Sequence, residues 1–181
     1  NIYEFRIDNS IIAKKARPGQ FIILRTEEKG ERIPLTIADN DENTITIVFI
    51  TAGHTTKKLS KLKEGEEIMD TAGPLGNPSR IEKFGTVILA SGGCGLAPIH
   101  PQAKALKQKG NKVIVIAGFK NKNMVFWEEK FKEFCDELII TTDDGSYKRQ
   151  GTPAEALKEK MEKEHIDKAT IIGPPPMMKA L

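Results

Sequence analysis

The stretch TVILASGGCGLAPIHPQAKAL, residues 86–106, joins a short apolar run to four small residues and then to a helical pattern. A glycine pair allows backbone angles that other residues avoid and lets another group approach the main chain closely. A helix that begins near Ala97 and Pro98 leaves N–H groups unpaired and carries a partial positive charge at its start. The stretch therefore favours a phosphate site, and the alternative is a tight strand-to-helix turn that binds nothing.

The residues after Arg80 alternate between short apolar strands and amphipathic helices. We expect strands at 86–90, 112–117, 137–142 and 169–173, with helices near 98–109, 124–135 and 154–165. This alternation predicts a doubly wound parallel sheet, whose ligands lie beyond the carboxyl ends of its strands. Three loops rich in glycine, aspartate or proline are expected at that edge, and they cover residues 91–96, 142–150 and 173–178.

The first 80 residues are typical of a β domain. Five expected strands, at 2–7, 20–26, 32–38, 44–50 and 66–73, are interrupted by one expected helix at 57–66. Their spacing predicts a small antiparallel β-barrel. We thus expect two domains, 1–80 and 81–181. The first begins in a strand-like stretch without Met and the second stops as a helix begins, so we expect the barrel to be incomplete at its N-terminus and the second domain at its C-terminus.

Composition narrows the function classes. A net charge of +3 with 39% hydrophobic and 29% charged residues suits a soluble globular protein. No apolar run reaches the roughly 20 residues of a membrane span, and scattered lysines with few aromatic residues give no support to nucleic-acid binding. The only cysteines, Cys94 and Cys135, are too far apart in sequence to predict a metal site, and their scarcity favours the cytoplasm.

Four local motifs and the order of the two domains resemble the ferredoxin–NADP reductase superfamily. The motifs are RIPLTIAD (32–39), TAGHTTKKL (51–59), GGCGLAP (92–98) and IGPPPMMKA (172–180). Within the superfamily the chain is most similar to two groups of electron-transfer subunits. These are the electron-transfer subunits of dihydroorotate dehydrogenase and the small subunits of NADH-dependent ferredoxin:NADP oxidoreductase, also known as sulfide dehydrogenase subunits. The resemblance implies an FAD-binding barrel followed by a Rossmann-like NAD(P)-binding domain.

The first motif implies the flavin site. By resemblance Arg32 binds the flavin phosphate, Pro34 and Leu35 line the cofactor, and Thr36 lies beside flavin N5 as the residue nearest the chemistry. A guanidinium suits a pyrophosphate, and a hydroxyl can hydrogen-bond a ring nitrogen. The spacing from Arg to hydroxyl is one residue longer than the common family form, and Pro34 and Leu35 replace an aromatic residue. An ordinary barrel strand is the alternative.

The second motif, by the same resemblance, places the flavin diphosphate at the helix start formed by Gly53, Thr55 and Thr56. The alternative is a plain helix cap, which Thr56 alone could form.

The third and fourth motifs imply the nicotinamide nucleotide site. The expected cofactor-binding residues are Gly92, Gly93, Cys94, Gly95, Gly173, Pro174 and Met177. We expect the helix start to lower the pKa of Cys94, and we expect its thiol to fill space near the nicotinamide. Met177 is expected to pack on the dinucleotide, and a Pro-rich strand terminator is the alternative for the last motif.

The loop TTDDGSYKRQ, residues 141–150, is expected to decide between NAD and NADP. Asp143 can accept a hydrogen bond from a ribose hydroxyl and would repel a phosphate. Lys148, Arg149 and Lys120 could instead gather around a phosphate. We expect NADH to be favoured over NADPH.

The resemblance implies hydride transfer from NAD(P)H to FAD, followed by single-electron transfer to an iron–sulfur centre or a protein partner. Relatives carry a [2Fe-2S] cluster in a Cys-rich segment beyond this end, so we expect the cluster only there. The implied partners are a catalytic subunit or a ferredoxin-like acceptor in a hetero-oligomer. Two alternatives stay open: a stand-alone ferredoxin or flavodoxin reductase, and a non-enzymatic nucleotide-binding regulatory module.

Overall fold

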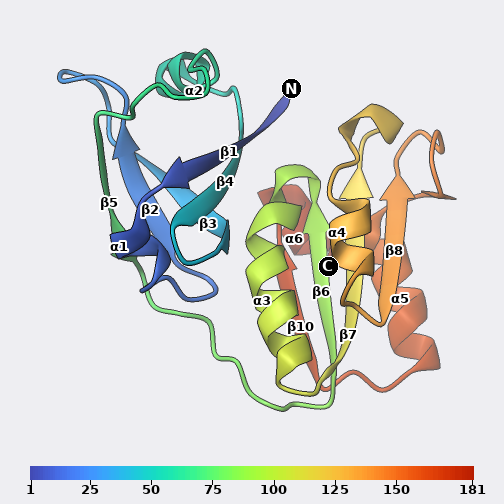
Figure 1. Cartoon of the computed structure of the whole chain (residues 1–181). Coiled ribbons are helices and arrows are strands. Elements are labelled where there is room, and N and C mark those ends of the chain that lie inside the picture. The colour runs from blue at the N-terminus through green and yellow to red at the C-terminus, as the bar shows by residue number, and fades with distance from the viewer. The chain divides into compact units, whose positions relative to one another are not determined.

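The computed structural model describes residues 1–181 and divides into two compact units, 1–79 and 80–181 (Figure 1). The first is built on an antiparallel sheet and the second on a parallel sheet with helices, which confirms the predicted fold class. None of the helices has both the length and the apolar character that crossing a membrane requires.

The first unit contains five antiparallel strands in the order β1-β4-β3-β2-β5. The strands are β1 (Ile2–Asp8), β2 (Phe21–Arg25), β3 (Ile33–Asn40), β4 (Thr44–Ile50) and β5 (Asp70–Leu75), with short helices α1 (Ser10–Ala13) and α2 (His54–Leu59). Asn9, just after β1, donates a hydrogen bond of 3.1 Å to the Thr71 hydroxyl in β5. This hydrogen bond links the end of β1 to β5 at one point, although no backbone ladder pairs the two strands.

The core of the first unit follows from strand alternation. Ile45, Ile47 and Phe49 of β4 all lie on one face and are buried, because successive side chains of a strand point to opposite faces. Ile22 and Leu24 of β2 and Leu59 of α2 belong to the same cluster.

The second unit contains five parallel strands in the order β10-β6-β7-β8-β9. The strands are β6 (Thr86–Gly92), β7 (Lys112–Phe119), β8 (Glu137–Thr142), β9 (Arg149–Gln150) and β10 (Lys168–Ile172). The helices are α3 (Leu96–Gln108), α4 (Glu128–Lys132), α5 (Pro153–Lys163) and α6 (Pro175–Ala180), with 3-10 turns η1 (Gly93–Gly95) and η2 (Lys122–Met124).

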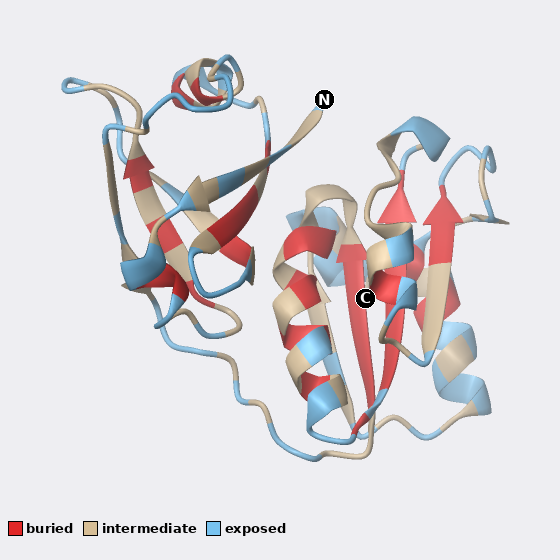
Figure 2. Cartoon of the chain, in the orientation of Figure 1, coloured by how far each residue is buried: buried red, intermediate tan, exposed pale blue.

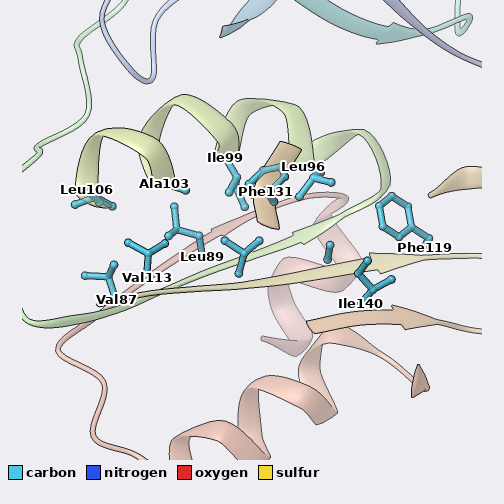
Figure 3. Close-up of a cluster of buried hydrophobic side chains, with 12 residues drawn as sticks. Val87, Leu89, Leu96, Ile99, Ala103, Leu106, Val113, Phe119, Phe131 and Ile140 are labelled. Atoms are coloured by element: carbon cyan, nitrogen blue, oxygen red, sulfur yellow. The ribbon is translucent and has the colours of Figure 1, made fainter. Parts of the chain in front are cut away.

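Both faces of the parallel sheet are covered. On one face Leu96, Ile99 and Leu106 of α3 point at the strands, where they meet Leu89 of β6 and Phe131 of α4 (Figure 3). On the other face α5 buries Ala156 and Leu157 against β6 and β7. The strands β6 and β7 are accordingly buried along most of their length (Figure 2), as expected for parallel strands between two layers of helix.

Several element boundaries differ from the sequence predictions. The helix expected at 124–135 is broken because Trp127 takes a left-handed conformation with φ of 58°, so only Glu128–Lys132 is helical. The helix expected at 57–66 starts earlier, at His54, and ends at Leu59. The last strand of the first unit is shifted from 66–73 to Asp70–Leu75.

Candidate functional site

The loops that follow β6 and β10 pack against each other through glycines. A Cβ on Gly95 would lie 2.5 Å from the carbonyl oxygen of Ile172, and a Cβ on Gly92 or on Gly173 would collide with the end of the Met177 side chain. Packing against backbone atoms thus requires glycine at position 95, whereas at positions 92 and 173 the neighbour is the flexible end of Met177, which can move aside. The structure brings Gly92, Gly95, Gly173 and Met177 together, and Met177 is half-buried over the two loops.

Gly93 differs from its neighbours. Its φ is +54°, which favours glycine, and no atom lies within 4 Å of the place where its Cβ would be. The helix α3 begins three residues later, so unpaired N–H groups are expected nearby. Gly93 is therefore the position of this loop where a ligand can reach the main chain.

The position of these loops in the sheet matters for ligand binding. The chain leaves β6 towards β7 on one side, whereas β10 lies on the other side of β6. Such a reversal of strand order leaves a crevice outside the carboxyl ends of the strands, and ligands of doubly wound sheets bind there.

The prediction that the helix start lowers the pKa of Cys94 is wrong. Cys94 is half-buried, and this burial raises the pKa of its thiol above the ordinary value. Desolvation disfavours the thiolate, and Cys94 lies inside the η1 turn, two residues before the first residue of α3. Burial thus favours the protonated form of the Cys94 thiol.

The loop after β8 is held in one conformation by its own hydrogen bonds. The Thr142 hydroxyl donates to the Tyr147 carbonyl at 2.8 Å and accepts from the Tyr147 N–H at 3.2 Å. Asp144 accepts from the Ser146 N–H at 2.9 Å, and hydrogen bonds from Ser146 lower the pKa of this carboxyl. The exposed Asp143 carboxylate forms no hydrogen bond or ion pair within the chain, so it is free to receive a donor.

The three basic residues considered for a phosphate are not equally available. Arg149 forms two hydrogen bonds with Glu159, at 3.0 and 2.5 Å. The Lys148 Nζ lies 3.6 Å from a Glu128 oxygen and 5.2 Å from the centre of the Tyr147 ring. Lys120 is exposed and makes no ion pair.

The contact between Glu128 and Tyr147 was not predicted from the sequence. The Tyr147 hydroxyl donates to Glu128 at 2.8 Å, which ties the loop after β8 to the start of α4. Nothing in the local pattern of either residue signals this contact, because it depends on how a loop folds back over 19 residues of sequence.

In the first unit, the site residues predicted from RIPLTIAD lie on two opposite faces of the strand. Leu35 packs against the core, so its side chain lies on the opposite face from Arg32, Pro34 and Thr36. The half-buried Thr36 lies opposite Phe21 of β2, and its hydroxyl forms no hydrogen bond within the chain.

Arg32 keeps most of its hydrogen-bonding capacity. Its side chain is 59% exposed and lies 3.6 Å from Asp70, which binds Arg25 more closely, at 2.5 Å. A guanidinium has five N–H donors, so several stay available for an anion.

Some hydrogen-bonding groups at the start of α2 are already paired within the chain. The Thr56 hydroxyl accepts from the N–H groups of Ala52 and Gly53, both at 3.0 Å, and thus caps the helix. The buried Thr55 donates to Glu31 at 3.3 Å, which joins this turn to the residue before Arg32. Gly53 faces open space where a Cβ would lie.

The residues present in the first unit fit a flavin dinucleotide. The exposed guanidinium of Arg32 and the open main chain of Gly53 at a helix start provide donors for a diphosphate. The unpaired hydroxyl of Thr36 provides a donor for a ring nitrogen. The acidic Glu27 beside this turn is neutralised by Lys58 at 2.5 Å.

No family model matches the sequence, but individual relatives do. The chain is 42% identical to the dihydroorotate dehydrogenase B (NAD(+)) electron transfer subunit homolog of Thermotoga maritima, over 99% of this chain and 64% of that protein. It is 34% identical to the dihydroorotate dehydrogenase B (NAD(+)) electron transfer subunit of Fusobacterium nucleatum, over 99% of this chain and 72% of that protein.

A solved structure of an NADH-dependent reduced ferredoxin-NADP oxidoreductase superposes with a TM-score of 0.92. The identity is 42%, over 98% of this chain and 65% of that chain. This chain therefore spans somewhat less than two thirds of that protein and of the Thermotoga relative. From this identity, coverage and fold, the chain belongs to the family of dihydroorotate dehydrogenase B electron transfer subunits, which has the ferredoxin reductase-like fold.

Proposed function

We propose that the chain is the FAD- and NAD(P)H-binding part of a flavoprotein oxidoreductase that moves electrons from a nicotinamide nucleotide to an iron–sulfur centre or protein partner. One observation carries this proposal. The loops after β6 and β10 meet at the reversal of strand order, and Gly93 leaves the main chain open there. Membership of an electron transfer subunit family supports it.

The nicotinamide nucleotide is proposed to bind along the carboxyl edge of the parallel sheet. Gly93 gives its pyrophosphate access to the start of α3, while Met177 and Cys94 line the same edge as neutral, polarisable side chains. Neighbouring strands are about 4.8 Å apart. A dinucleotide that starts at β6 can therefore reach across β7 to the loop after β8.

We propose NADH rather than NADPH as the substrate. The Asp143 carboxylate is exposed and free to accept from a ribose hydroxyl. The Arg149 guanidinium is bound by Glu159 and is not available to a 2′-phosphate.

FAD is proposed to bind the outer face of β3. Arg32 would hold its diphosphate next to the open main chain of Gly53, and Thr36 would present its hydroxyl to the flavin ring. The chemistry that FAD supplies when bound is to accept a hydride and to release single electrons. The chain's own part is to hold each of the two groups at its own unit, and no side chain need act as acid, base or nucleophile.

The partners follow from the same proposal. A catalytic subunit or a ferredoxin-like protein would receive the electrons in a hetero-oligomer, and the relatives named above support this. A [2Fe-2S] cluster is not assigned to residues 1–181, in which no group of three metal-ligating side chains gathers. The cytoplasm is the proposed compartment, since both cysteines are free thiols.

An absorption spectrum tests the function directly. The purified chain is incubated with FAD, desalted and scanned, and then NADH or NADPH is added anaerobically. We expect flavin bands that NADH bleaches faster than NADPH. A chain that retains no flavin favours the regulatory module instead, and faster bleaching by NADPH overturns the NADH assignment.

A further inference from the structure

Glu128 joins two elements that border the proposed nucleotide site. Its side chain is only 12% exposed although it is ionisable. One carboxylate oxygen accepts from the Tyr147 hydroxyl at 2.8 Å. The other lies 2.7 Å from the Lys132 Nζ and 3.6 Å from the Lys148 Nζ. Two cations and one hydroxyl therefore converge on a single carboxylate.

The carboxylate is charged at neutral pH. Burial by itself would raise the pKa of Glu128, but hydrogen bonds from Lys132 and Tyr147 and the charges of Lys132 and Lys148 outweigh it, and the pKa is lowered. Lys132 has a second partner in Glu129 at 2.8 Å. Lys148 has no other carboxylate partner, so Glu128 chiefly controls Lys148.

The surroundings of Lys148 contain both signs of charge. The Nζ atoms of Lys148 and Lys122 lie 5.2 and 5.5 Å from the centre of the Tyr147 ring. Asp143 and Asp144 lie on the same loop, and Asp144 is occupied by Ser146. Without Glu128, the cations would outnumber the free carboxylates around Tyr147.

We propose that Glu128 is a specificity-determining residue that holds Lys148 against Tyr147 and places a negative charge beside it, and thereby excludes a 2′-phosphate from the nucleotide site. This inference rests on the proposed function, because it assumes that the adenosine end of the dinucleotide reaches the loop after β8. A dianionic phosphate that approached Lys148 would be repelled by Glu128 and would have to displace it. A ribose hydroxyl meets no such opposition.

The test compares two probes that differ only by a 2′-phosphate, 5′-AMP and 2′,5′-ADP, by titration calorimetry with the whole chain at one moderate salt concentration. Glu128→Gln keeps the size of the side chain and an acceptor for Tyr147 but removes the charge. We expect 2′,5′-ADP to bind about three- to tenfold more tightly, the gain expected from one partly exposed charge contact. The affinity for 5′-AMP should change less than twofold.

Glu129→Gln is the matched control. Glu129 is the next residue of the same helix, is 83% exposed and shares Lys132, but it has no contact with Lys148. This variant should leave both affinities unchanged. In the Glu128→Gln background, Lys148→Gln should abolish the gain, since Lys148 is the cation that Glu128 releases.

Each other outcome overturns the inference. An unchanged ratio of affinities in Glu128→Gln, or an equal rise in Glu129→Gln, removes Glu128 as the determinant. Equal weakening of both probes shows that Glu128 only supports the loop. Failure of the parent chain to bind either probe overturns the proposed nucleotide site itself, and the inference falls with it.

Discussion

Replacing Gly95 by alanine should destabilise the second unit, although the change adds a single methyl group. The new Cβ would lie 2.5 Å from the Ile172 carbonyl oxygen and 3.3 Å from the Gly173 Cα. These are backbone atoms at the end of β10, so they cannot rotate away as a side chain would. Overpacking of this kind costs about 1–3 kcal/mol. In a unit of about 100 residues, each kcal/mol lowers Tm by about 4–8 °C.

Replacing Gly93 by asparagine should instead largely keep the stability of the second unit and weaken nucleotide binding. No atom lies within 4 Å of the added Cβ, and asparagine is among the residues that best tolerate a φ of +54°. We expect a smaller loss of stability than at Gly95, because asparagine visits the left-handed region without a steric clash here. The side chain would project into the space through which a pyrophosphate reaches the main chain, so nucleotide binding should weaken strongly while the protein stays folded.

The assay measures thermal unfolding by circular dichroism and the bleaching of bound flavin by NADH for both variants. We expect Gly95→Ala to unfold at least about 4 °C below the parent. Gly93→Asn should unfold at a higher temperature than Gly95→Ala but resist bleaching. Normal bleaching of Gly93→Asn would refute the placement of the nucleotide at this loop. An unchanged Tm for Gly95→Ala would refute the packing argument.

Three further predictions concern the first unit. Arg32→Ala should weaken FAD binding about tenfold to a hundredfold, as expected for a lost charge-assisted phosphate contact, and fluorescence titration with FAD measures this. Thr36→Val should leave FAD affinity within about threefold but slow flavin bleaching in stopped flow, because the lost hydroxyl contributes one neutral hydrogen bond. Hydrogen bonds from Asn43 and Thr44 lower the pKa of Asp41 to about 2 from 3.8. This stabilisation is present above the unfolded value and is lost as pH falls from about 4 to 2, so urea midpoints should fall less steeply over that range in Asp41→Asn.

The parallel sheet could be predicted from the sequence because its signals are local. Runs such as Val87–Ala90 are apolar without alternation, and the structure buries them on both faces. The break at Trp127 could not be predicted, since nothing in the segment from 124 to 135 marks a left-handed residue. There, contacts of Trp127 with His100 and Phe126 accompany the break.

The candidate site was predictable only in part, for a similar reason. Motif residues mark a place in the chain, but the pKa of Cys94 depends on its burial, and the availability of Arg149 depends on Glu159 in the next helix. The pairing of Glu128 with Tyr147 likewise exists only after the loop has folded. Such contacts join separate elements, so periodicity cannot reveal them.

The glycine loop shows how far the neighbours of a residue decide its role. In GGCG, Gly92 and Gly95 face Met177 and Ile172, whereas Gly93 between them faces open space. Identical residues in one short motif thus carry different constraints: Gly95 is fixed by packing against backbone, Gly92 faces a movable side chain, and Gly93 is set by backbone conformation and access. A substitution at Gly93 or at Gly95 would weaken nucleotide binding, but of these two only at Gly93 would the loss separate from unfolding. For this reason stability and binding have to be measured on the same variants before the loss of activity is assigned to the nucleotide site.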